Sequence, residues 1–188
     1  MSPALVDWFL ILVGVVLTAG TALFVAAEFS FVAADSTQVS RRAANGDRRA
    51  ALVKRAMEQL STQLSGTQVG ITLTTILLGY TTQKALGRLV TDALGHTALA
   101  LGVATTIGMA VALVLTNLFS MIFGELIPKN VALADPIRAA SAVVRFQTGF
   151  TWLFRPLIAV LNGSANWVLR RMGVEVAEEL SGVRSARE

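Results

Sequence analysis

The sequence predicts an all-α membrane protein with three transmembrane helices, and its composition, its charge and the spacing of its apolar residues carry that prediction. Of the 188 residues, 54% are hydrophobic and 15% are charged. Soluble domains have about 25% charged residues, and a soluble domain of this size still leaves about a third of its chain surface in water. A chain this apolar would expose too much hydrocarbon to water, so we expect it to fold in a bilayer.

Three uncharged stretches are long enough to cross a bilayer, which takes about 20 helical residues. Their lengths are 20, 25 and 28 residues, and they cover residues 8–27, 59–83 and 97–124. We expect each helix to extend somewhat beyond its uncharged stretch. The predicted spans are therefore about residues 5–34, 63–90 and 97–127.

The segments outside these spans are amphipathic and are predicted to form juxtamembrane helices at about residues 36–60 and 136–172. In the first segment, apolar residues recur at helical spacing, and Asn45-Gly46-Asp47 divides it into two short helices, with Asp47 or a neighbour as the cap. The second segment carries Trp152 and Trp167, which suit a membrane surface. Both segments are expected at the cytoplasmic interface, although the first could also be a solvated hairpin.

The distribution of Lys and Arg predicts the orientation of the chain. Six basic residues follow the first span, two lie between the second and third, and eight follow the third, whereas none precedes the first. Cytoplasmic loops carry the excess of Lys and Arg. We therefore expect a multi-pass protein of the plasma (inner) membrane, with the N-terminus outside and the C-terminus in the cytoplasm.

The residue inventory excludes several classes of chemistry. The chain has no cysteine and one histidine, His96, so thiolate sites and multi-histidine metal sites cannot form within it. No nucleophile–base pair is evident, and we predict no enzymatic activity. The basic excess fits cytoplasmic loops, so no nucleic-acid partner is expected.

Charged and polar residues at the edges of the spans are the candidate functional groups. Glu125 ends the third span, and Pro128 after it removes a backbone donor, which frees a carbonyl about one turn earlier, at Gly124. A carboxylate beside free carbonyls suits hard cations such as Mg²⁺ or Ca²⁺. Thr72 and Thr75 present neutral hydroxyls on one face of the second span, although membrane threonines also bond to helix carbonyls or to neighbouring helices.

Two further residues have a structural and a functional interpretation. Glu28 could mark the cytoplasmic end of the first span or pair with Lys129. Asn117 lies two turns before Glu125, on the same face, and could join helices or line a pore.

Four segments resemble the transmembrane module of the CNNM/CorC (cyclin M-like, hemolysin-C-like) magnesium transporters. They are Phe24-Val25-Ala26-Ala27-Glu28-Phe29-Ser30, Gln68-Val69-Gly70-Ile71-Thr72-Leu73, Gly124-Glu125-Leu126-Ile127-Pro128-Lys129 and Leu161-Asn162-Gly163-Ser164-Ala165-Asn166. The third resembles the Gly-Glu-x-x-Pro-Lys signature of the family. The match is collinear over about residues 5–180, and the combination of segments is specific.

The resemblance implies a homodimer in the lipid bilayer and a site for dehydrated Mg²⁺, the substrate ion. Glu125 matches the glutamate of the family, whereas Val25 stands where a serine is usual and Thr75 where an asparagine is usual. Ser30 or Thr72 could supply a replacement oxygen. The implied metal ligands are Glu125, Gly124, Thr72, Thr75 and Ser30, with Glu28, Asn117, Pro128 and Lys129 in support.

The leading hypothesis is thus a divalent-cation transporter or exporter module in residues 1–174. Residues 175–188 would link it to a cytoplasmic CBS-domain pair, absent from this sequence, that binds ATP. The alternative is a non-transporting scaffold with a degenerate ion site, which anchors cytoplasmic domains or a membrane or cytoplasmic protein partner.

Overall fold

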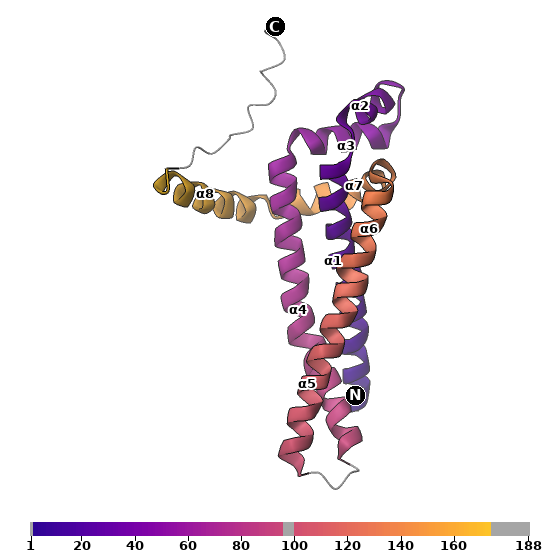
Figure 1. The fold of residues 1–188 in the computed structure, drawn as a ribbon, viewed down its shortest axis with the longest axis vertical. Helices are drawn as coiled ribbons and strands as arrows, with labels where there is room; N and C mark the ends of the chain where they lie inside the picture. Colours follow the sequence, from indigo (N-terminus) through magenta and orange to yellow (C-terminus); the bar gives the residue numbers. More distant parts are fainter. Residues whose placement is uncertain (1, 96–99, 174–188) are drawn as a thin grey trace. The chain divides into compact units, whose positions relative to one another are not determined.

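The computed structural model describes residues 2–95 and 100–173, and the described residues are almost entirely helical (Figure 1). Within these two ranges no β-strand is present. The predicted all-α class is therefore confirmed. His96 and the predicted linker at 175–188 lie outside the described residues.

The helices follow one another with short connections. In chain order they are α1 (Pro3–Ala33), α2 (Ser36–Ala44), α3 (Arg48–Glu58), α4 (Leu60–Leu94), α5 (Leu101–Phe119), the π-helix η1 (Ser120–Leu126), α6 (Ile127–Ala134), α7 (Pro136–Leu153) and α8 (Arg155–Arg171). Helices α5, η1 and α6 continue without a break (Figure 1).

Two helical stretches are long and apolar enough to cross a membrane, Pro3–Ala33 and Leu101–Ala134. Only 28% and 22% of their most apolar windows are buried within the chain, so most of this apolar surface has no protein cover. Helix α4 has 35 residues but does not meet the same criterion. Several threonines and glutamines lower the hydropathy of its first half. Its second half contains the charged residues Lys84, Arg88 and Asp92. A span at 63–90 within α4 therefore stays a prediction, as does the dimer.

Two aspartates start the short helices after α1. The Asp35 carboxylate accepts hydrogen bonds from the backbone N–H groups of Thr37 and Gln38, at 2.7 and 3.2 Å. Asp47 caps α3 in the same way, with bonds from Arg49 and Ala50. Each cap satisfies backbone donors that a helix start leaves without partners. The predicted break at residues 45–47 is therefore observed, with Asp47 as the cap.

The chain divides into two compact units, to both of which α1 and α4 contribute residues. The first unit comprises Met1–Val25 and Gly70–Asn130. In it, glycines let helices approach closely: a Cβ added at Gly108 of α5 would lie 3.0 Å from the Gly87 carbonyl oxygen of α4. Small residues at helix contacts are typical of membrane helices.

An ion pair joins the start of α1 to the later part of α4 in the first unit. The buried carboxylate of Asp7 accepts hydrogen bonds from the Arg88 guanidinium, with the Nε–Oδ1 distance at 3.0 Å. A buried carboxylate needs such a partner, because its charge is otherwise costly to desolvate. The pair therefore fixes the register of α1 against α4 at this end of the unit.

The second unit comprises Ala26–Val69 and Val131–Glu188, and it has its own apolar core. Side chains from the end of α1, from α2 and α3, and from α7 make up this core. Its buried members are Ala27, Phe31, Ala34, Val39, Val53, Ala56, Ile137, Ala140, Val143 and Val144.

A buried polar network joins α4 to α7 in the second unit. The Gln147 amide nitrogen donates to the Gln63 backbone oxygen at 3.1 Å and to the Thr151 hydroxyl at 3.0 Å. That hydroxyl donates to the Gln63 side-chain oxygen at 3.0 Å. A Cβ at Gly66 would lie 3.0 Å from the same Gln147 nitrogen, so the close approach of the helices requires glycine there.

We predict that the cap on α2 weakens in acid. The backbone N–H groups of Gln38 and Thr37 hold the pKa of Asp35 below its ordinary value of 3.8. Because the pKa is lower in the folded state, the cap contributes stability above the unfolded pKa and loses it as the pH falls through the folded pKa. Hydrogen-exchange protection of the α2 amides should therefore decrease as the pH falls below about 4.

The variant Asp35→Asn is the control, because asparagine caps helices about as well and does not titrate in this range. Its α2 protection should not change with pH in the same interval. Equal acid sensitivity in both proteins would contradict the assignment to Asp35.

Candidate ion site

Small residues at intervals of four form the buried side of the helix that starts at Leu101. An α-helix has about 3.6 residues per turn, so a four-residue interval drifts around it by about 40° per step. A π-helical segment has more residues per turn and therefore offsets part of this drift. The buried residues at these positions in the first unit are Ala104, Gly108, Ala112, Thr116, Gly124 and Pro128.

The π-helix η1 lies directly before Pro128, and the Ile127 N–H donates to the Ile122 carbonyl, five residues earlier. Proline has no N–H, so residue 128 donates neither to Gly124, its α-helical acceptor, nor to Phe123, its π-helical acceptor. Short π segments inside α-helices are frequent at functional sites. The change in helix type thus occurs where the backbone loses a donor, beside Glu125.

Gly124 lies against α1. A Cβ built on it would be 3.5 Å from the methyl carbons of both Thr18 and Thr21, and 3.4 Å from the hydroxyl of Ser120. These are close van der Waals distances, so alanine would fill the space and a larger side chain would not fit. The backbone of the Gly-Glu motif is therefore held next to a face of α1 that carries hydroxyl groups.

A hydrogen-bonded pair of threonines joins α1 to α4 in this unit. The hydroxyl oxygens of Thr21 and Thr74 are 2.7 Å apart. Thr21 also lies 3.1 Å from the Leu17 carbonyl oxygen, and Thr74 lies 2.9 Å from that of Gly70. Each hydroxyl has one proton and two lone pairs. The two protons can therefore serve only two of these three contacts, and each oxygen keeps at least one lone pair as an acceptor.

This arrangement offers oxygen ligands and one carboxylate. Hydroxyl, carbonyl and carboxylate oxygens are ligands for hard cations such as Mg²⁺ and Ca²⁺. Within residues 2–95 and 100–173, no three His, Cys, Asp or Glu side chains gather as a metal cluster. A cation bound beside Glu125 would therefore depend mainly on neutral oxygens for the rest of its coordination.

The residues predicted as metal ligands fall into both units. Gly124 is buried and Glu125 is exposed on η1, while Thr72 and Thr75 are exposed on α4, all in the first unit. Ser30 belongs to the second unit, where its buried hydroxyl donates to the Ala27 carbonyl at 3.3 Å.

The predicted supporting residues are placed as follows. Pro128 is buried and Lys129 is exposed, both on α6. Asn117 is exposed on α5, and its side-chain amide donates to the Leu113 carbonyl of the same helix at 2.8 Å. Glu28 is half-buried on α1 in the second unit.

Sequence reasoning singled out Thr72 and Thr75 and missed the threonines that contact one another. Thr74 is one of several threonines in the second predicted span, whereas Thr18 and Thr21 lie within the otherwise apolar first span. Gly14, Thr18 and Thr21 share one face of α1 at intervals of four and three residues, and all three are buried. This run of small residues was the available signal for a helix contact.

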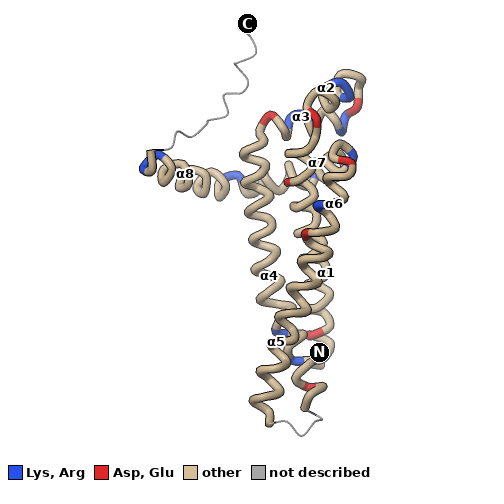
Figure 2. Tube along the Cα trace, in the orientation of Figure 1, with Lys and Arg blue, Asp and Glu red and all other residues tan. Residues whose placement is uncertain are grey.

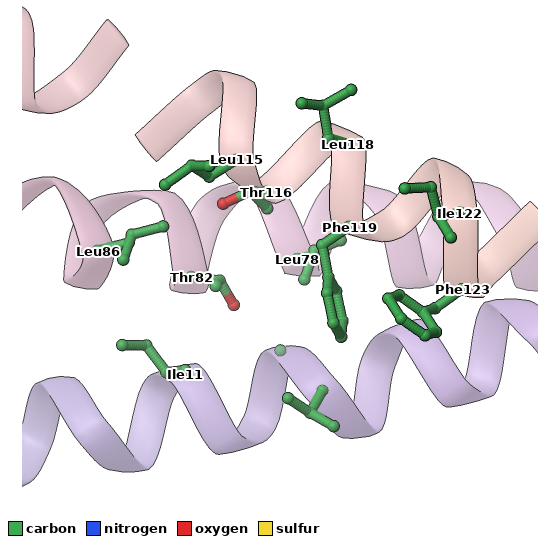
Figure 3. Close-up of a pocket in the computed structure, with 12 residues that line it drawn as sticks. Ile11, Leu78, Thr82, Leu86, Leu115, Thr116, Leu118, Phe119, Ile122 and Phe123 are labelled. Carbon is green, nitrogen blue, oxygen red and sulfur yellow. The ribbon is translucent and has the colours of Figure 1, made fainter. Parts of the chain in front are cut away.

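A mostly apolar cavity of about 420 Å³ lies in the same unit, lined by α1, α4, α5 and η1 (Figure 3). The rings of Phe119 and Phe123 project into it, with their centroids 4.7 Å apart. The Thr116 hydroxyl, at its edge, is buried without a hydrogen-bond partner among the described residues. Because its walls are apolar, this cavity does not offer a coordination shell for an ion.

Comparisons with known proteins identify the family of the chain. The family described as "Cyclin M transmembrane N-terminal domain" matches residues 12–186. A UPF0053 protein of Mycobacterium tuberculosis is 44% identical over 92% of this chain and 38% of its own length. The UPF0053 protein YhdT of Bacillus subtilis is 35% identical over 95% of this chain and 39% of its own length. The chain thus spans about two-fifths of these relatives.

The packing of Gly124 against α1 can be tested by changing its size. Gly124→Leu should lower the free energy of unfolding by about 1–3 kcal/mol, because the larger side chain overpacks the contact with Thr18 and Thr21. Gly124→Ala is the control and should be tolerated. Thermal unfolding in detergent measures both, and equal stability of the two variants would contradict the close contact.

Proposed function

Because this chain belongs to the cyclin M (CNNM) transmembrane family, we propose that it is the membrane module of a divalent-cation transporter or exporter, with Mg²⁺ as the substrate ion. The observation that carries the proposal is the carboxylate of Glu125 on a π-helical segment of the apolar helix 101–134. A charge inside or beside a bilayer costs about 2.5–3.5 kcal/mol on insertion scales. Such a group is usually functional.

The proposed site combines the Glu125 carboxylate with oxygens around Gly124. In this proposal the carbonyls before Pro128 and the hydroxyls of Thr21 and Thr74 supply neutral ligands. Thr72 and Thr75, which the family resemblance implies, are the other candidates in this unit. Mg²⁺ prefers about six oxygens in near-octahedral geometry, so water completes the shell.

The arrangement of the whole protein is also proposed. We infer three spans, with the N-terminus outside, the C-terminus in the cytoplasm and two copies joined through the transmembrane helices. A cytoplasmic CBS-domain pair that binds ATP would follow. The distribution of Lys and Arg supports the orientation, and the greater length of the relatives supports further domains.

The variant Glu125→Gln tests the proposal, since it keeps the shape of the side chain and removes its charge. Mg²⁺ affinity measured by isothermal titration should fall by about tenfold or more, as even outer-shell changes cost that much at metal sites. Mg²⁺ flux into liposomes should fall to the protein-free level. Thr21→Val and Thr74→Val should each weaken binding less than Glu125→Gln does.

Two controls accompany these variants. Glu58→Gln removes an exposed carboxylate that pairs only loosely with Lys54, at 4.0 Å. Thr81→Val removes a hydroxyl that donates to its own helix, at the Leu77 carbonyl. Both controls should bind and transport normally. Unchanged binding and flux in Glu125→Gln would refute the proposed site.

A non-transporting scaffold is the second candidate, and the residue at position 25 favours it. Val25 is buried and apolar where the family resemblance expects a serine oxygen. The double variant Val25→Ser/Thr75→Asn restores the usual family residues at both positions, and it discriminates between the transporter and the scaffold. If the native site is degenerate, the double variant should gain Mg²⁺ affinity from an undetectable level. If the native chain transports Mg²⁺, its own binding is already measurable.

A further inference from the structure

The second unit contains a cavity of about 510 Å³ that belongs to neither the ion site nor the apolar cavity described above. Helices α3, α4, α7 and α8 line it, together with the residue that ends α3, Gln59. Its walls mix polar and apolar side chains. The cavity is therefore suited to an amphiphilic ligand rather than to a purely apolar one.

Two arginines from distant parts of the sequence line this cavity. Arg55 comes from α3 and Arg155 from the start of α8, and both are exposed. Among the described residues, none that lines the cavity is Asp or Glu. Guanidinium groups bind phosphate and carboxylate through paired hydrogen bonds. The charge of the cavity thus favours an anionic ligand with several acceptor oxygens.

The inner wall of the cavity is polar and held by hydrogen bonds. Gln63 and Thr151 line it and are at least nine-tenths buried, and their side chains are bonded to each other at 3.0 Å. Asn162 of α8 also lines it and accepts a hydrogen bond from Ser65 at 2.8 Å. The bond from Ser65 uses the Asn162 side-chain oxygen and leaves the amide N–H groups of Asn162 as donors. The wall is therefore preorganised and can donate hydrogen bonds.

Helix α8 has the pattern of a helix at a membrane surface. Leu157, Leu161 and Val168 are exposed and share one face, at intervals of four and seven residues. Basic residues lie at both ends of the helix (Figure 2), namely Arg155, Arg170 and Arg171. Trp152, also lining the cavity, is 75% exposed. Exposed tryptophan beside basic residues is typical of the lipid–water interface.

We propose that this cavity binds the phosphate headgroup of an anionic phospholipid between Arg55 and Arg155. The two guanidinium groups pair with the phosphate, while Gln59 and Asn162 are positioned to donate to its glycerol or ester oxygens. The lipid is the favoured source of the phosphate because the exposed Trp152 lines the cavity, and because α8, which also lines it, carries exposed apolar side chains. Phosphate bound by Lys and Arg near a membrane surface is a known mode of lipid recognition.

The test measures lipid retention by the full 188-residue chain. Native mass spectrometry in detergent, with equal amounts of phosphatidylglycerol and phosphatidylcholine, reports which lipid stays bound. The wild-type chain should retain phosphatidylglycerol in preference. In Arg55→Gln/Arg155→Gln this preference should fall by about tenfold or more, because both charge-assisted pairs are lost.

A matched control removes the same charge from another place in the unit. Arg41 and Arg42 lie on α2 and do not line this cavity. Arg41→Gln/Arg42→Gln should therefore keep the lipid preference. An equal loss in both double variants would mean general surface attraction and would overturn the proposal.

Two further experiments complete the test. The first separates the effect of the cavity's shape from that of its charge, and the second separates binding of a lipid from binding of a free phosphate ester. Ala159→Phe fills the cavity without changing charge, and should also abolish the preference. Glycerol 3-phosphate is then added at millimolar concentration. Displacement of the lipid by this soluble ester, or normal retention in Ala159→Phe, would overturn the assignment to a lipid bound in the cavity.

Discussion

A helix in hydrocarbon must satisfy its own backbone N–H and C=O groups, because no water is there to do so. Pro128 removes one donor from the helix that starts at Leu101, and the preceding residues 120–126 adopt π-helical geometry. In this π-helical segment Gly124 packs against α1, while Glu125 is exposed. The position of Glu125, the close approach of Gly124 and the proposed ion site all depend on this segment.

The threonines of the first unit serve both packing and hydrogen bonding, through the methyl and hydroxyl groups of the same kind of side chain. The methyl groups of Thr18 and Thr21 contact the position of Gly124, and the hydroxyl of Thr21 bonds to that of Thr74. A valine would pack as well but would offer no oxygen. Threonine therefore lets the helices approach closely and still leaves oxygen lone pairs available in the unit that contains Glu125.

The fold could be predicted from the sequence to the extent that it depends on local patterns. Long apolar runs locate α1 and the helix from Leu101, and the turn residues before Asp47 separate α2 from α3. The rotation of each helix about its axis depends on contacts between distant segments. For this reason the sequence pattern did not indicate that Thr74 bonds to Thr21. The π-helix could not be predicted either, since a proline in the sequence indicates only that one backbone hydrogen bond is missing.

The central claim is that a hard divalent cation binds at the Glu125 carboxylate. A structure of the chain determined with Mn²⁺ in place of Mg²⁺ tests this most directly, because the anomalous signal of Mn²⁺ locates the ion. The account predicts a peak within about 2.0–2.3 Å of a Glu125 carboxylate oxygen, as inner-sphere coordination of these small cations requires. Anomalous density that is absent there, or that lies only at other acidic residues, would contradict it.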